Sequence, residues 1–378
     1  MSTIWQLENR KRTEIFDDIQ LLLEESSCLD WLGDKSAPIY LKPNLVVAKP
    51  ASTGATTTPA VAEGLILFLN RAGYKNISFA EGSWVGDSTG RAYKICGYET
   101  LSQKYNIPLL DLKKDEAISL KTHGESFKIC RSLYELNEKG GSLINLPMLK
   151  GHGQTNITCA LKNLKGCIPD SEKRRYHSLG VHRPVALLNT LIKPAFALVD
   201  GLNGDPGWEE GGSPQEHNLL FIGKDPVTID SYAAKLLGYR PDEVEYILLA
   251  HQFGLGSLFS DDDLIELKET SANHRRDSLN LRTEEIKTLK KQFSEIIDDD
   301  SACSACHSHL LSALKVLSNK NPELFNGFQS KSIQIGQGFK EKKLLTTTRG
   351  IGICTAGAEK YCPGCPPASS KIIEFLSE

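Results

Sequence analysis

The sequence predicts an α/β fold: a mostly parallel sheet flanked by helices, followed by a small C-terminal α/β domain that is rich in cysteine. Short apolar segments of strand length alternate with segments that are apolar at helical spacing, up to about residue 280. The strand segments are apolar on both faces, as in a parallel sheet that helices cover on both sides. Half of the ten cysteines fall in the last 76 residues, which indicates a separate, smaller unit there.

The elements of the first unit follow from its apolar pattern and its end signals. The predicted strands are short apolar runs, at 39–47, 76–83, 107–112, 142–149, 196–201 and 218–223. The predicted helices have apolar residues at intervals of three and four, at 12–25, 91–105 and 155–168. Two more helices are marked by a capping residue with proline after it. One begins at Thr58-Pro59 and stops at Gly73, and the other begins at Asp225-Pro226 and stops at Gly238.

These elements divide the chain into three parts. Residues 1–282 form the predicted α/β domain with a basic ligand crevice. Residues 283–300 are highly charged but keep apolar residues at helical spacing, so they predict a connecting helix that ends in the run Asp298–Asp300. Residues 301–378 form the predicted small C-terminal domain that contains the clustered cysteines. Its expected elements are a helix near 308–318, strands at 332–336 and 343–348, and a terminal helix from about 368.

Composition narrows the class of protein. Lysine and arginine (44) nearly balance aspartate and glutamate (47), and the formal charge of −3 gives no reason to expect a nucleic-acid partner. No run reaches the ~18 apolar residues that span a membrane, and charges interrupt the N-terminus, so we expect a cytoplasmic protein without a membrane partner. In such a chain, ten cysteines favour metal ligation or redox chemistry over disulfides.

The C-terminal cysteines have metal-site spacing. They form the pair Cys303-x-x-Cys306, then Cys354, then the pair Cys362-x-x-Cys365. A tight turn lets both sulfurs of such a pair aim at one centre, and two pairs in so small a domain predict a metal site. Prolines follow Cys362 and Cys365, as in the Cys-Pro segments of ferredoxins. The Gly-Cys-Pro-Pro string is similar to a cluster-binding segment of hydrogenase small subunits.

We therefore expect an iron–sulfur cluster of the [4Fe-4S] type, with structural zinc as the alternative and cysteines that bind no metal as a third possibility. Four ligands suffice, and the expected set is Cys303, Cys306, Cys354 and Cys365. Cys362 is the fifth candidate and can exchange with Cys365. The other cysteines are interpreted as small buried hydrophobic residues: Cys28, Cys96, Cys130, Cys159 and Cys167.

A basic segment in the first unit indicates an anionic small-molecule partner. Between Lys150 and Arg183 there are seven lysines or arginines and only two acids. The segment follows a predicted strand and is entered through Gly151-His152-Gly153, where backbone amides can approach a ligand. The alternative is a solvated helix face. The expected ligand-binding residues are Lys162, Asn163, Lys165, Lys173 and Arg174, and the expected catalytic residues are Lys150, His152 and His177.

A second candidate anion site lies in the loop after the first predicted strand. It begins with Lys42-Pro43-Asn44 and leads to the capped helix start at Thr58, and it places Lys42 and Asn44 among the expected ligand-binding residues. Both basic segments follow strands, and ligands of open parallel sheets gather at the carboxyl ends of strands. We therefore expect one crevice between the 150–177 segment and the Lys42 loop, with the cluster facing it.

In several of these segments, the chain resembles a family known as domain of unknown function 362, which is often linked to iron–sulfur modules. The matching segments are LKPNLV (41–46), 57–73, 144–177, LVDGLNG (198–204) and 222–238. The resemblance implies an α/β fold and a redox association. The cysteine region departs from the ordinary ferredoxin pattern of many relatives.

The leading hypothesis is an iron–sulfur oxidoreductase or electron-transfer protein that acts on an anionic substrate or cofactor held by the lysines and histidines. A redox partner protein is an expected companion. The alternative is a non-redox isomerase or transferase with a structural metal site. Whether the chain is itself an enzyme is left open by the sequence.

Overall fold

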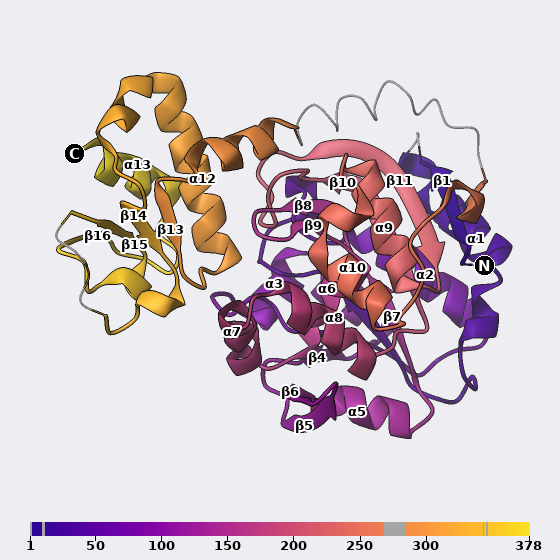
Figure 1. Ribbon diagram of the computed structural model, residues 1–378. Coiled ribbons are helices and arrows are strands. Elements are labelled where there is room, and N and C mark those ends of the chain that lie inside the picture. Colours follow the sequence, from indigo (N-terminus) through magenta and orange to yellow (C-terminus); the bar gives the residue numbers. More distant parts are fainter. Residues whose placement is uncertain (1, 10–11, 268–283, 343, 345–346) are drawn as a thin grey trace.

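The computed structural model describes residues 2–9, 12–267, 284–342, 344 and 347–378. Its large domain contains an eight-stranded sheet with the order β12-β1-β11-β10-β7-β2-β3-β4. The strands are β1 (Ile4–Glu8), β2 (Ile39–Pro43), β3 (Ile77–Glu81), β4 (Leu109–Asp111), β7 (Ser142–Leu146), β10 (Phe196–Gly204), β11 (Gln215–Gly223) and β12 (Leu264–Glu266). Figure 1 shows this sheet in the right-hand part of the molecule.

The sheet is mostly parallel. Strands β10, β7, β2, β3 and β4 run side by side in one direction, while β11 is antiparallel to both of its neighbours, β10 and β1. The carboxyl ends of β2, β3 and β7 therefore open at the same edge. The predicted α/β class with a mostly parallel sheet is confirmed.

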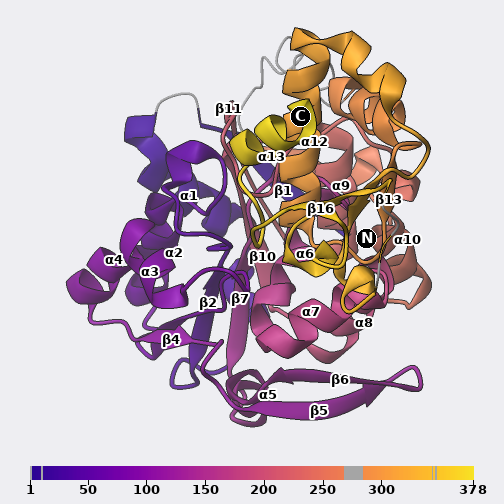
Figure 2. The same ribbon diagram turned by 90° about the vertical axis from the view of Figure 1, so that its left-hand side faces the viewer.

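Helices cover both faces of this sheet, as Figure 2 shows with the sheet nearly edge-on. One face carries α1 (Ile15–Glu25), α2 (Pro59–Arg71), α3 (Thr89–Ile95) and α4 (Tyr98–Tyr105). The other carries α6 (Ala160–Asn163), α8 (His182–Leu191), α9 (Pro226–Leu236) and α10 (Glu245–Gln252). Each face has its own apolar core. At the periphery lie α5 (Arg131–Glu138), α7 (Asp170–Ser178) and the hairpin of β5 (Ala117–Thr122) and β6 (Glu125–Cys130).

Local end signals position two of these helices as the sequence predicts. Thr58 is the N-cap of α2 and Pro59 its first residue, and Gly73 follows the helix with φ +96°. Asp225 caps α9, because its carboxylate accepts hydrogen bonds from the backbone amides of Val227 and Thr228.

Two predicted helices are wrong in outline. The segment 91–105 is broken into α3 and α4 at Gly97, whose φ of +84° interrupts a right-handed helix. The segment 155–168 begins as strand β9 (Asn156–Thr158), paired with β8 (Lys150–His152), and then continues as the single turn of α6 and a 3-10 turn over Leu164–Cys167. Asn156 turns the hairpin with φ +66°.

The start of α6 is fixed by a side chain that is distant in the sequence. Asp230 of α9 accepts hydrogen bonds from the backbone amides of Ala160 (2.6 Å) and Leu161 (3.2 Å). Its carboxylate thus caps the short helix that carries Lys162 and Asn163.

The small domain has a four-stranded parallel sheet, β13 (Ile297–Asp299), β14 (Ile333–Ile335), β15 (Arg349–Ile351) and β16 (Lys360–Cys362). Helices α12 (Ser304–Lys320) and α13 (Ser369–Ser377) pack on it. The predicted strand at 343–348 falls partly on residues 343, 345 and 346, which lie outside the described residues. The strand that the structure describes is β15, slightly further along the chain.

The predicted connecting helix is wrong at its end. The chain is helical over 284–293, whereas 297–299 form β13 because they pair with β14. The predicted boundary at 282 and 283 lies outside the described residues. Leu289 and Phe293 of this helix belong to the core of the small domain, and Ile286 packs against Gly207 of the large domain. The helix is therefore integrated into the small domain and contacts the large one.

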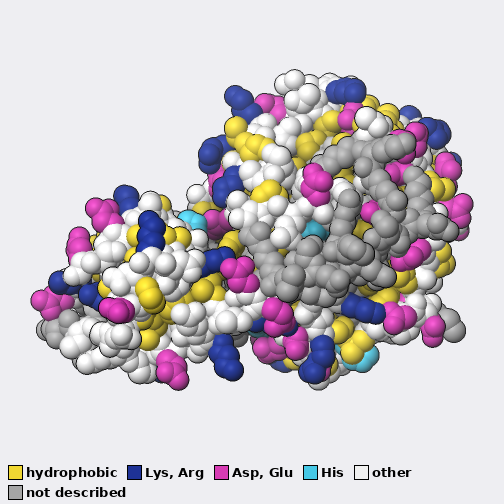
Figure 3. Space-filling model, turned by 90° about the horizontal axis from the view of Figure 1, so that it is seen from above, with side chains coloured by type: hydrophobic (Ala, Val, Ile, Leu, Met, Phe, Trp, Pro, Cys, Tyr) yellow, Lys and Arg dark blue, Asp and Glu magenta, His cyan; other side chains and the backbone are white. Residues whose placement is uncertain are grey.

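The small domain stands as a separate lobe beside the large one, and on the face seen in Figure 3 acidic and basic side chains are interspersed. This agrees with the nearly balanced charge of the chain. Among the helices that the structure describes, none combines the length and apolar composition needed to cross a bilayer.

Candidate functional site

A cavity of about 300 Å³ lies at the carboxyl ends of β2 and β3, between the two domains. Many of the predicted site residues line it: Lys42, Asn44, Lys162, Asn163, Lys165, Lys173, Arg174, His177, Cys303, Cys354 and Cys365. The structure thus brings the Lys42 loop, the basic segment and the C-terminal cysteines together. That a ligand occupies the cavity stays a prediction.

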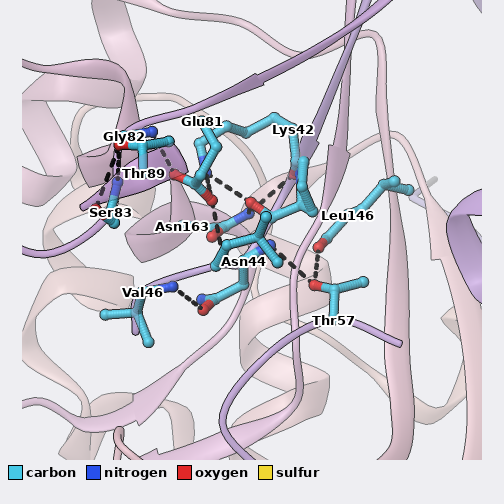
Figure 4. Close-up of polar contacts among 12 residues, drawn as sticks. Lys42, Asn44, Val46, Thr57, Glu81, Gly82, Ser83, Thr89, Leu146 and Asn163 are labelled. Carbon is cyan, nitrogen blue, oxygen red and sulfur yellow. Dashed lines mark hydrogen bonds and ion pairs between the residues drawn. The ribbon is translucent and has the colours of Figure 1, made fainter. Parts of the chain in front are cut away.

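The deepest wall contains a buried ion pair. Lys42, at the end of β2, and Glu81, at the end of β3, are both almost fully buried, and their Nζ and Oε2 atoms are 2.8 Å apart. Glu81 also accepts hydrogen bonds from the backbone amides of Leu45 and Gly82, and Lys42 donates to the carbonyl of Pro43. Figure 4 shows these contacts. The charge of Lys42 is therefore balanced inside the protein.

Asparagines fasten this wall to the basic segment. Asn163 donates from Nδ2 to the carbonyl of Lys42 (3.2 Å) and to Oδ1 of Asn145 (2.7 Å). Gly166 lies so close that a Cβ there would stand 2.3 Å from Oε1 of Glu81 and 2.6 Å from Nζ of Lys42. A glycine is required at this position because the backbone touches the ion pair.

Glu209 connects three of the predicted residues. Its Oε1 lies 2.8 Å from Nζ of Lys162, and its Oε2 lies 2.9 Å from Nε2 of His152. Its backbone carbonyl accepts a hydrogen bond from Lys150 (2.8 Å). Burial raises the pKa of Glu209, but Lys162 and His152 outweigh this effect and hold the pKa well below its usual value. Glu209 is thus an ionised carboxylate at the cavity wall.

Lys150 and His152 lie behind this wall and do not line the cavity. Lys150 is completely buried and donates to Ala55, Glu209 and the side chain of Asn44. Burial lowers the pKa of Lys150 to about 7 and that of His152 to about 3. Nδ1 of His152 accepts two backbone N–H groups, from Gln154 and Thr155, so its proton sits on Nε2 and points at Glu209. Both residues therefore position Glu209.

The cations differ in whether they have a partner. Lys173 donates to the carbonyls of Gly82 and Ser83 and pairs with Asp170. Lys165, in contrast, has no hydrogen bond or ion pair within the described part of the chain. It keeps some surface open to the cavity while protein surrounds it, and burial together with the charge of Lys162 lowers its pKa to about 7.

Two further predicted residues lie at the same wall. His177 lines the cavity, and burial, reinforced by the charge of Lys165, lowers its pKa well below the usual value. His177 is therefore neutral near pH 7. Arg174 is exposed at the rim, where its backbone carbonyl accepts a hydrogen bond from Gln337 of the small domain.

Four of the five candidate cysteines come together. Cys303 is the N-cap residue of α12 and Cys306 lies in its first turn. The thiol of Cys306 donates to Cys303, and this bond, with the helix amides, lowers the pKa of Cys303 to about 7. The pKa of Cys306 is raised by the same bond, by burial and by the nearby thiols of Cys303, Cys365 and Cys354.

Cys362 is placed elsewhere. It is buried among the apolar residues of the small domain's core and is absent from the cavity lining. Of the two alternatives for the fourth ligand, Cys365 is the one whose position joins the group. All ten cysteines are free thiols.

The surroundings of the four sulfurs suit a bound group. Gly352, with φ +88°, brings the backbone close to Cys306, since a Cβ there would stand 3.4 Å from its Sγ. Gly364, with φ +146°, precedes Cys365, and a Cβ there would stand 2.5 Å from the backbone of Pro367. Four thiols are the kind of donor set that a [4Fe-4S] cluster uses, and a cluster at this place stays a prediction. Within the described residues, no group of three or more His, Cys, Asp or Glu side chains is found that could hold a metal ion.

Direct contacts fix the small domain over the cavity. Gln154 donates from Nε2 to the carbonyl of Ala302, and its Oε1 accepts from Ser304. His309 pairs with Glu210 at 3.0 Å. These contacts attach the hairpin after β8 and the Glu209 loop directly to the helix that carries Cys303.

Several residues that line the cavity are not predicted from the sequence. Glu209 and Glu210 come from the loop after β10, and Trp84 and Lys340 also line the cavity. One sequence feature could have indicated Glu209 and Glu210: they form a pair inside the glycine-rich string GWEEGG (207–212), shortly after a strand end. Nothing in the local pattern marks Trp84 or Lys340.

Comparisons with known proteins give one relative and one family. The chain is similar to Thylakoid-associated protein sll1697 of Synechocystis sp., with 27% identity over 235 residues, which cover 59% of this chain and 69% of that protein. No solved structure matches the chain significantly. A family model matches residues 39–235, a range that ends before the C-terminal cysteines. The chain therefore belongs to the family described as Domain of unknown function (DUF362).

Proposed function

We propose that this protein is an iron–sulfur redox protein that binds an anionic small molecule beside its cluster. The proposed ligands of a [4Fe-4S] cluster are Cys303, Cys306, Cys354 and Cys365. The observation that carries the proposal is that three of these cysteines line the same cavity as the lysines of the basic segment. A bound cluster of this kind accepts and donates single electrons.

The residues of the large domain are proposed to bind the ligand and to handle its proton. Lys165 supplies positive charge that no carboxylate balances within the described residues. His177, neutral near pH 7, is the group that we assign to proton exchange with the ligand. Lys162 and His152 hold Glu209 in place, and the contacts of Gln154 and Glu210 hold the small domain at the edge of the cavity.

Two finer points belong to the same proposal. A redox partner protein would approach Cys365, because this is the exposed member of the four. We also propose that the protein works in the cytoplasm. The name of the cyanobacterial relative describes that protein as thylakoid-associated.

The test is the metal content of protein purified without oxygen. We expect brown protein with iron and acid-labile sulfide, and visible absorption that bleaches on reduction. Cys306→Ser and Cys365→Ser should each greatly reduce the iron content. Cys362→Ala is the matched control, because it changes a cysteine of the same domain that lies in the core, and it should retain iron.

Colourless protein with one equivalent of zinc would overturn the proposal. It would favour the alternative of a non-redox isomerase or transferase with a structural metal site. Loss of iron in Cys362→Ala together with full iron in Cys365→Ser would show that the ligand set is wrong.

A further inference from the structure

Among the described residues, the cavity wall contains a partly buried lysine, Lys165, that has no counter-charge; Arg174 and Lys340 also lack an ion pair, but both are exposed. Lys42 is paired with Glu81, and Lys162 with Glu209. Lys165 lines the same cavity and has no ion pair or hydrogen bond in the segments that the structure describes. A partly buried ammonium without a partner is unfavourable, and a ligand anion would relieve it.

Another part of the wall is apolar. Val46 and Val47 follow β2, and Trp84 follows β3; all three are partly exposed and line the cavity. Across the domain boundary, Ile353 also lines it and keeps 52% of its surface exposed. An apolar surface of this kind, enclosed by two domains, is typical of a site for an apolar ligand body.

Hydrogen bonds hold the backbone of Trp84, and Gly86 packs against its ring. The backbone amide of Trp84 donates to the carbonyl of Val46 (2.9 Å), and its own carbonyl accepts from Lys113 (3.1 Å). Gly86 lies against the six-membered ring, where a Cβ would come within 2.3 Å of the ring carbons. A rigid aromatic side chain at a cavity wall favours a ligand with a flat ring.

We infer that the cavity binds a small aromatic carboxylate, with its carboxylate on Lys165 and its ring against Trp84. This names the substrate class of the proposed redox site and rests on that proposal. The binding itself requires no cluster. A single charge on the ligand suffices, because the deeper lysines already have partners.

The test is titration calorimetry at pH 6.5 with three probes: 2-naphthoate, the neutral 2-naphthalenemethanol and acetate. We expect 2-naphthoate to bind at least tenfold more tightly than either of the others. Lys165→Gln should weaken 2-naphthoate at least tenfold and leave the neutral probe unchanged, which also shows that the variant is folded. Trp84→Leu should weaken both aromatic probes. Lys121→Gln changes an exposed lysine of β5 and should alter nothing.

Acetate that binds as tightly as 2-naphthoate would overturn the aromatic part of the inference. Unchanged 2-naphthoate affinity in Lys165→Gln would overturn the role of Lys165. Iron is measured on the same samples. If protein without iron binds 2-naphthoate, the inference is supported and the proposed redox function is contradicted. If brown, iron-containing protein does not bind 2-naphthoate, the inference is contradicted and the redox function is supported.

Discussion

Lys42 and Glu81 form a buried ion pair at the ends of the neighbouring strands β2 and β3, with their Nζ and Oε2 atoms 2.8 Å apart. The two residues are 39 positions apart in the chain. Parallel pairing of the two strands places both side chains at one edge of the sheet. The pair forms the deep wall of the cavity and is the anchor of the site.

Breaking this pair should destabilise the protein strongly. Lys42→Met leaves the carboxylate of Glu81 buried without its cation, a change that costs about 3–5 kcal/mol in comparable cases. Urea unfolding at pH 7 measures the loss. Arg131→Met is the control, because its pair with Glu116 is exposed and should contribute less than about 1 kcal/mol. Equal losses in the two variants would contradict the importance of the buried pair.

A methyl group at Gly166 should disturb the same wall. Its Cβ would overlap Glu81 and Lys42, so Gly166→Ala should lower the free energy of unfolding by about 1–3 kcal/mol. Gly327→Ala serves for comparison, since a Cβ there meets nothing within 4 Å and no positive φ is involved. A Gly166→Ala protein as stable as the Gly327→Ala protein would show that the wall is looser than described.

Lys165 gives a stability effect with a defined pH dependence. Its pKa is about 7 in the folded chain and 10.5 as a free side chain. Between pH 7 and pH 10.5, folding therefore releases a proton from Lys165. The free-energy cost of burying this lysine is greatest below pH 7 and declines toward pH 10.5. The charged groups around it are Lys162, Glu209, Lys173 and Cys303.

Lys165→Met should therefore be more stable than the wild type in the absence of added anions. The gain in the free energy of unfolding should be largest at pH 6 and smaller at pH 9, as followed by urea titrations at both values. A gain that grows with pH, or a loss at pH 6, would contradict the isolated, desolvated state of this lysine.

Cations at the rim should raise the reduction potential of the proposed cluster. Arg174 and Lys340 lower the pKa of Cys365, and Lys340 lowers that of Cys354, although burial raises both pKa values overall. The same positive charges favour the more negative, reduced cluster. Arg174→Gln and Lys340→Gln should each lower the potential in a redox titration.

Lys320 provides the control for these variants. It ends α12, the helix that begins beside Cys303, and so lies roughly 20 Å from Cys306 along the helix axis. Lys320→Gln should leave the potential unchanged. A shift equal to that of Arg174→Gln would mean that overall charge, and not proximity to the sulfurs, sets the potential.

The sequence predicts the parts of the fold that depend on local signals. The strands of the parallel sheet and the starts of α2 and α9 are predicted correctly, because short-range apolar patterns, proline at the first helical position and the capping carboxylate of Asp225 determine them. The segment 155–168 is misread, because its apolar spacing also fits a hairpin followed by a single helical turn. The carboxylate that decides between the two belongs to Asp230, about 70 positions away.

In the site, too, the sequence predicts some residues and misses the residues that pair with them. The lysines and cysteines are conspicuous in the sequence, and the carboxyl ends of parallel strands explain why they gather at one edge. Their partners are not conspicuous. Glu209 is 47 positions from Lys162 and 57 from His152, so the sequence alone does not show which lysines are neutralised. Only the structure separates Lys165, which has no partner among the described residues, from Lys42, Lys162 and Lys173, which are paired.

We propose that the cluster and the anion cavity form one site. Electron paramagnetic resonance of anaerobically purified, dithionite-reduced protein tests it most directly. We predict an iron–sulfur signal whose g-values shift when 2-naphthoate is added, and no shift in Lys165→Gln. Absence of any iron–sulfur signal, or a signal that is identical with and without 2-naphthoate in the wild type, would contradict the claim.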